Sequence, residues 1–107
     1  MGALGGMADA EGRRSVSAEH QATAIDRILA LRRVLGAQPR AAELAALVEE
    51  CGYLVSAVQA FHMEAIRFRM YGLTRQLTRL DPPAPREAVA LLDEARGALE
   101  AAGFQTK

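Results

Sequence analysis

Apolar residues recur at alternating intervals of three and four positions along the middle of the chain. Such spacing places side chains on one stripe of an α-helix and, when it is sustained, is typical of coiled coils. The helix is predicted to begin at Pro39, whose fixed φ suits a first helical turn, and the prolines of segment 81–85 end it. We expect this seam to lie in the core or at a dimer interface; its residues are Leu44, Leu47, Cys51, Leu54, Val58, Phe61, Ala65 and Phe68.

A second apolar stripe follows within the same predicted helix. It lies roughly a quarter-turn round the helix from the first, so one straight partner cannot cover both stripes. We interpret this offset as a change of packing partner near residues 65–72. If the helix breaks, Gly72 is the position we predict for the break. The second stripe consists of Ile66, Met70, Leu73, Leu77 and Leu80.

A shorter helix is predicted ahead of the long one, over residues 17–35. Ser17 is a good N-cap, and Gly36 follows the last apolar positions as a helix-ending glycine should. Residues 1–15 are rich in glycine and offer little to bury, so we expect a disordered tail there. The rest, residues 16–107, is predicted to form a single helical domain.

A third helix is predicted over residues 86–102, after the proline-rich segment. Gly103 and Phe104 indicate a Schellman ending, in which glycine adopts a left-handed backbone and Phe104 folds back on Leu99. We expect this helix to pack on the second half of the long helix, and helix 17–35 to pack on the first half.

The predicted fold is therefore all-α, a three-helix chain with a long central helix. A helix over residues 39–80 would be about 60 Å long, whereas a compact domain of this chain length is about 35 Å across. Half of the long helix would stand outside a monomer. We expect a second copy to cover its exposed apolar surface in a dimeric helical bundle.

The composition indicates the cellular compartment of the protein more clearly than it indicates any chemical activity. The chain has 13 basic and 13 acidic residues, so no overall field attracts it to nucleic acid or to an anionic membrane. A single cysteine excludes an intrachain disulfide and suits a reducing compartment. No stretch of sequence is long and apolar enough to span a membrane. We expect a cytoplasmic protein that does not contact membranes.

One group of polar residues in the second half of the long helix suggests a binding surface. Arg67, Tyr71, Arg75 and Arg79 are spaced by four residues, which places them on one helix face, opposite the second apolar stripe. Arginines near an aromatic ring can hold phosphates and stack on bases, but they suit an acidic patch on a protein equally well. The simpler interpretation is a solvated helix face with Tyr71 at the edge of the core.

Metal chemistry has little support in the sequence. His62 and Glu64 form an H-x-E string, but the P-C-x-x-C segment that accompanies it in zinc deaminases is missing. Cys51 lies three turns from His62 on the predicted helix, about 16 Å away, so the two cannot bind one ion within one chain. The only metal site we consider is one at His62 shared across a dimer axis. Cys51 is interpreted as a small buried apolar residue, and no cofactor is predicted.

The common catalytic strings are also missing. The chain has no P-loop, Rossmann glycine pattern, nucleophile elbow or H-E-x-x-H string. We therefore expect a non-enzymatic helical protein–protein interaction or scaffolding module that forms a homodimer and binds a protein partner. A small regulatory nucleic-acid-binding protein that uses the basic face is the first alternative. A small metal-binding protein with a site across a dimer axis is the second.

Overall fold

The computed structural model describes the backbone of residues 2–107 and the side chains of residues 16–107. In this part of the chain the secondary structure is entirely helical, which confirms the predicted all-α class. This part of the chain contains four helices, whereas the sequence predicts three. They are α1 (Gly2–Gly36), α2 (Ala45–Gln59), α3 (Met63–Thr78) and α4 (Arg86–Ala101).

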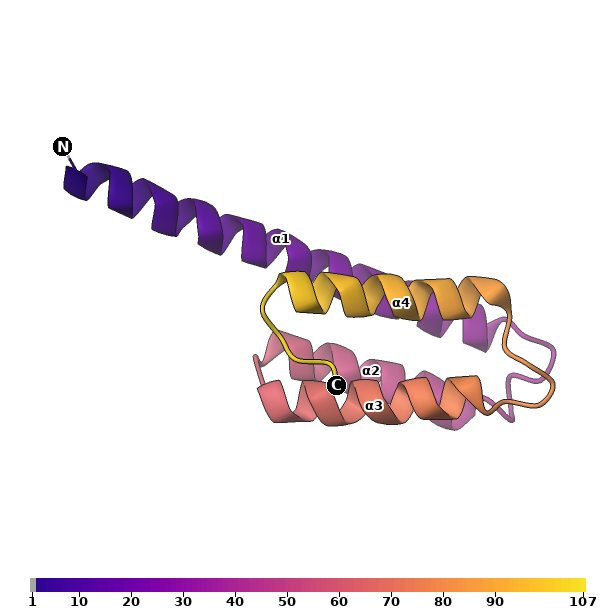
Figure 1. Cartoon of the computed structure of the whole chain (residues 1–107). Coiled ribbons are helices and arrows are strands. Elements are labelled where there is room, and N and C mark those ends of the chain that lie inside the picture. The colour runs from indigo at the N-terminus through magenta and orange to yellow at the C-terminus, as the bar shows by residue number, and fades with distance from the viewer. Residues whose placement is uncertain (1) are drawn as a thin grey trace.

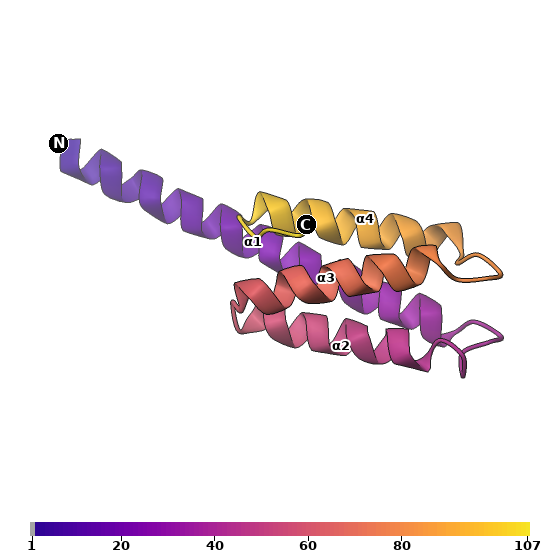
Figure 2. The ribbon, with the colours of Figure 1, turned by 60° about the horizontal axis from the view of Figure 1, so that its bottom comes forward.

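The four helices form an antiparallel bundle in which the chain runs alternately up and down. Figure 1 shows α1 and α4 in one layer and α2 and α3 in the other, and Figure 2 shows the same bundle turned about the horizontal axis. The amino-terminal part of α1 projects beyond the bundle, and the molecule measures 60 × 23 × 18 Å. α4 packs mainly on α1, and α3 and α4 make the least extensive contact. The predicted pairing of residues 86–102 with the second half of the long helix is therefore wrong in its main contact.

The predicted long helix is two helices, and the chain reverses between them at residues 60–62. The last turn of α2 ends as a Schellman motif: the backbone N–H of His62 donates to the carbonyl of Ala57 at 3.0 Å, and that of Phe61 to Val58 at 3.1 Å. Phe61 occupies the left-handed position of this motif, with φ 54°. His62 then caps α3, because its Nδ1 accepts a hydrogen bond from the N–H of Ala65 at 3.2 Å.

The quarter-turn offset between the two apolar stripes marks this reversal. The first stripe is buried from Leu44 to Val58, and the second is buried from Ile66 to Leu77, but each lies on its own helix. Phe61 and Phe68, which the heptad spacing assigned to the seam, are 62% and 71% exposed. Since the long helix is absent, the geometric argument for a dimer no longer applies. The homodimer itself stays a prediction.

Gly72 is not the break. It lies inside α3, and a Cβ placed on it would meet no heavy atom within 4 Å. Pro39 does not begin a helix either, because residues 37–44 form tight turns before α2. In these turns the N–H of Glu43 donates to Arg40 at 2.9 Å, three residues back, which is the spacing of a 3₁₀ turn and not of an α-helix.

The first helix begins earlier than predicted. Residues 2–15, expected to form a disordered tail, are helical backbone at the start of α1, and Met1 lies outside the described residues. Ser17 does not cap the helix; its hydroxyl donates to the carbonyl of Ala102 at 3.1 Å and so ties α1 to the end of α4. Because the Ser17 hydroxyl bonds to α4, it does not cap a helix N-terminus, and α1 continues through this residue.

The end of α4 matches the prediction. The N–H of Phe104 donates to the carbonyl of Leu99 at 2.9 Å, and that of Gly103 donates to Glu100 at 3.0 Å, with φ 98° at Gly103. The chain therefore turns back across the bundle. Phe104 is buried, and its ring lies 6.0 Å from the ring of Phe61 at an angle of 44°. The fold-back brings the segment 103–107 against the start of α3.

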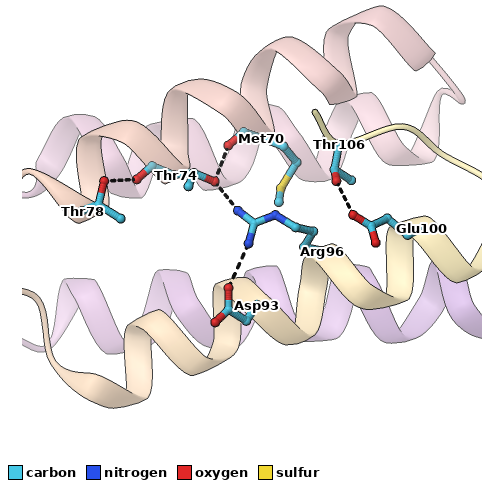
Figure 3. Close-up of polar contacts among 7 residues, drawn as sticks. All are labelled: Met70, Thr74, Thr78, Asp93, Arg96, Glu100 and Thr106. Atoms are coloured by element: carbon cyan, nitrogen blue, oxygen red, sulfur yellow. Dashed lines mark hydrogen bonds and ion pairs between the residues drawn. The ribbon is translucent and has the colours of Figure 1, made fainter.

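A polar bridge spans the loosely packed side of the bundle, between α3 and α4 (Figure 3). Arg96 of α4 donates to Asp93 at 2.8 Å and also to the hydroxyl of Thr74 on α3. Thr74 in turn donates to the carbonyl of Met70 at 2.7 Å. Because the backbones of α3 and α4 do not approach closely, this long side chain provides the polar link between them.

The backbone at Phe61 can be tested by comparing two substitutions that both remove the ring. We expect Phe61→Gly to be more stable than Phe61→Ala by about 1 kcal/mol, because a Cβ is unfavourable in the left-handed conformation. At Gly72 the order should reverse, and Gly72→Ala should stabilise the protein by about 1 kcal/mol, as in any open helical site. Urea denaturation followed by circular dichroism measures both. Alanine matching or exceeding glycine at residue 61 would indicate a continuous helix there.

Cys51 provides a test of the core. Its side chain is fully buried, and burial raises the pKa of the thiol from 9.0 to about 11, although the nearby Arg32 charge lowers it slightly. Between these two pH values the unfolded thiol loses its proton while the folded thiol keeps it. We therefore expect the thiol's contribution to stability to fall by about 3 kcal/mol as the pH rises through this range.

Cys51→Ala isolates this effect, because its cavity costs the same at every pH. Urea denaturation of both proteins under reducing conditions should show the stability difference between wild type and variant shrinking from pH 9 to pH 11. A difference that is constant over this range would mean that the thiol is open to solvent.

Candidate functional site

The basic residues singled out in the sequence do share one surface. Arg67, Tyr71, Arg75 and Arg79 are all exposed on α3 and the residue that follows it, on the side opposite the buried stripe of Ile66, Met70, Leu73 and Leu77. Their spacing of four residues places them along the length of the helix. The structure thus brings together all four predicted binding residues.

Phe68 belongs to the same surface, although the heptad spacing predicts that it lies in the core or at a dimer interface. Phe68 is 71% exposed and lies between Arg75 and Arg79 in angle round the helix, and Tyr71 is itself 59% exposed. Among side chains that the structure describes, four of the seven exposed large apolar residues lie between residues 61 and 71, so apolar exposure is concentrated at this site. We call this surface the α3 outer face; it consists of Glu64, Arg67, Phe68, Tyr71, Arg75 and Arg79.

A depression lies beside the amino-terminal half of the α3 outer face. Its volume is about 440 Å³, and it is lined by Glu64, Arg67, Phe68, Tyr71 and Lys107. A smaller hollow of about 160 Å³ adjoins it, between the first turns of α3 and Gln105. The segment after α4 therefore contributes to the site. Sequence reasoning missed Lys107, because its position depends on the fold-back at Gly103 and not on any periodic pattern.

The three arginines of the α3 outer face are free to meet a partner. Within the described side chains, none of Arg67, Arg75 and Arg79 forms an ion pair. Arg75 and Arg79 lie near the carboxyl end of α3, where cations also stabilise a helix. Arg67 lies in the first half of α3 and has no such role in the helix.

Arg69 shows what a structural arginine looks like on the same helix. Its guanidinium contacts both carboxylate oxygens of Glu50 on α2, at 2.9 and 3.1 Å, and lies 4.9 Å from the centre of the Tyr53 ring. Tyr53 donates to Glu49 at 2.8 Å, and this hydrogen bond, with the charge of Glu49, raises the pKa of Tyr53. This cluster joins α2 to α3, whereas the side chains of Arg67, Arg75 and Arg79 form no such link to any described part of the bundle.

The residues considered for a metal site have structural positions instead. His62 caps α3, and Cys51 is buried in α2. Over the described residues, no three histidine, cysteine, aspartate or glutamate side chains gather closely enough to hold a metal ion. None of the described helices combines the length and apolar character that crossing a membrane requires.

The site is one of charge and apolar contact. It holds two exposed aromatic rings and three guanidinium groups that pair with no carboxylate among the described side chains. Such groups bind anionic and apolar surfaces by ion pairing, stacking and burial. Comparison of the chain with known protein families, with curated proteins and with solved structures finds no match in any of the three. Its function is therefore inferred from the residues of the α3 outer face.

Proposed function

We propose that this protein is a non-enzymatic helical interaction module, and that the α3 outer face binds an acidic, partly apolar segment of another protein. One observation carries the proposal: Phe68 and Tyr71 are exposed on the same face as three arginines that form no ion pair with any side chain of residues 16–107. Tryptophan, tyrosine and arginine are the side chains most often found at the energetic centres of protein interfaces, and phenylalanine is also enriched in their cores. The bundle itself gains nothing from holding these rings in solvent.

The length of the basic surface favours a macromolecular partner over a small molecule. Arg67 and Arg79 are twelve residues apart, which corresponds to about 18 Å along a helix. A ligand that contacts both must extend over that distance. A partner helix of roughly twelve residues, or an extended segment of about six, has this length.

The charges of the neighbouring helices favour a protein over nucleic acid. The sequence of α2 has two carboxylates and no basic residue, and that of α4 has four carboxylates and two arginines. The arginines of α3 therefore lie between two helices whose own sequences carry net negative charge. A nucleic-acid backbone carries closely spaced phosphates and needs a broader basic surface, because like charges beside the contact repel it.

Charge also disfavours pairing of two copies through this face. A symmetric contact would set the arginines of one α3 outer face against those of another, with Glu64 as the only carboxylate of that face to offset them. An acidic partner removes that repulsion. We therefore expect the homodimer predicted from the sequence to use a surface other than the α3 outer face.

Photo-crosslinking can identify the partner in cells that make this protein. A benzoylphenylalanine in place of Phe68 should crosslink to a protein, and the same residue in place of Val89, exposed on α4, should not. Equal crosslinking at both positions, or none at residue 68, would count against the proposal.

Binding of the purified partner should then depend on the arginines. We expect Arg67→Gln, Arg75→Gln and Arg79→Gln together to weaken binding about threefold to a hundredfold, since each exposed ion pair contributes roughly 0.2–1 kcal/mol. The matched control changes three exposed arginines elsewhere to Gln: Arg32, Arg33 and Arg86. The control alters net charge equally and should leave affinity nearly unchanged. Equal losses in both triple variants would show that only net charge matters. Salt-dependent binding to RNA or DNA that is lost in the first variant, without a protein crosslink, would favour the nucleic-acid alternative instead.

A further inference from the structure

The segment 103–107 gives the α3 outer face a feature that a single helix cannot have, which is a pocket with two sides. α3 supplies one wall, through Glu64, Arg67, Phe68 and Tyr71, and Lys107 supplies the other. We infer that this pocket takes one aromatic side chain of the acidic partner segment, together with the carboxylate next to it. This inference rests on the proposed function and assigns Lys107 to the interface.

The position of Lys107 is fixed by contacts that the residues before it make with the bundle. The Schellman motif at Gly103 reverses the chain, and the buried ring of Phe104 packs on Phe61 at 6.0 Å. Two residues later, Thr106 is also buried, and its hydroxyl donates to Glu100 at 2.7 Å. Because alternate residues of this short segment are fixed to the bundle, the side chains of Gln105 and Lys107 are directed to the hollows beside α3.

The chemistry of the pocket suits an aromatic group beside an anion. The rings of Phe68 and Tyr71 offer stacking surfaces. Among the side chains that line the pocket, Arg67 and Lys107 are cationic and Glu64 is anionic, so these side chains carry one net positive charge. A volume of about 440 Å³ lies within the range of natural ligand pockets and accommodates a phenylalanine or tryptophan side chain.

The pocket also sets where the anchor side chain must lie in the partner. It is at the amino-terminal half of α3, whereas Arg75 and Arg79 extend away from it toward the other end of the helix. A partner segment therefore has its aromatic residue near one end and its remaining carboxylates on one side of it. The depression is open to the rest of the face, so the segment can continue from the pocket along the arginines.

Lys107 is the only lysine in the sequence, which makes it a specific probe. Reductive dimethylation with ¹³C-formaldehyde labels it while keeping its positive charge, and the amino terminus gives the only other signal. The probe ligand is a blocked pentapeptide with the sequence Phe-Asp-Glu-Asp-Glu, which has its aromatic residue at one end and its four carboxylates on one side of the ring. Two matched peptides separate the contributions of ring and charge: one replaces the phenylalanine by alanine, and the other replaces the four acids by their amides.

We expect the Lys107 methyl signal to shift and saturate as the acidic phenylalanine peptide is added. Backbone amide signals of Phe68 and Tyr71 should shift with the same apparent affinity. Both control peptides should bind at least threefold more weakly. Lys107→Gln should weaken binding about threefold to tenfold, Lys107→Arg should restore it, and the exposed Arg33→Gln on α1 should have no effect.

Several results would overturn the inference. One is a Lys107 signal that does not move while Phe68 and Tyr71 shift, and another is equal weakening by Lys107→Gln and Arg33→Gln. Failure of the acidic peptide to bind would also remove it. These outcomes are distinct from failure of the proposed function, because the crosslinked natural partner would still lose affinity in the triple arginine variant. If that dependence is absent as well, both proposals fall.

Discussion

The architecture depends on a left-handed backbone at one residue that has a Cβ. Phe61 stands between α2 and α3, and its φ of 54° sends the chain back along the helix that it has just left. Such a conformation is unfavourable for any residue with a side chain, by about 1–2 kcal/mol. It is held here by the two hydrogen bonds of the Schellman motif, by the cap at His62, and by the contact between the rings of Phe61 and Phe104. Because α3 turns back, both apolar stripes face one shared core.

How far the sequence predicts this fold differs between its two Schellman endings. Gly103 is the residue type that such an ending prefers, so the end of α4 could be predicted from Gly103 and Phe104 alone. The ending at Phe61 uses a residue that rarely adopts a left-handed backbone, and no local signal marks it. The quarter-turn offset between the two apolar stripes does mark the boundary between α2 and α3. However, a straight helix that changes its packing partner and a chain that reverses direction give the same apolar spacing. In the structure, the exposure of Phe61 and Phe68 and the hydrogen bonds at residues 60–62 distinguish the reversal from a change of partner.

The binding surface was predictable where it depends on helical spacing alone. Arg67, Tyr71, Arg75 and Arg79 lie on one face of α3 whether the preceding residues are continuous or broken. The sequence predicts Phe68 in the core or at a dimer interface, because the heptad count from Leu44 reaches Phe68 only if it continues through residues 60–62. Lys107 approaches α3 through contacts of Phe104 and Thr106 with residues far away in the sequence, and periodicity carries no information about these.

The projecting part of α1 has a consequence for how the molecule behaves in solution. A particle with axes of 60 × 23 × 18 Å experiences more drag than a sphere of the same mass. It should leave a gel-filtration column early, at a volume expected of a larger protein, even as a single chain. Elution volume alone would then give the impression of a dimer. Light scattering or sedimentation equilibrium, which measure mass independently of shape, distinguish an elongated single chain from a true pair.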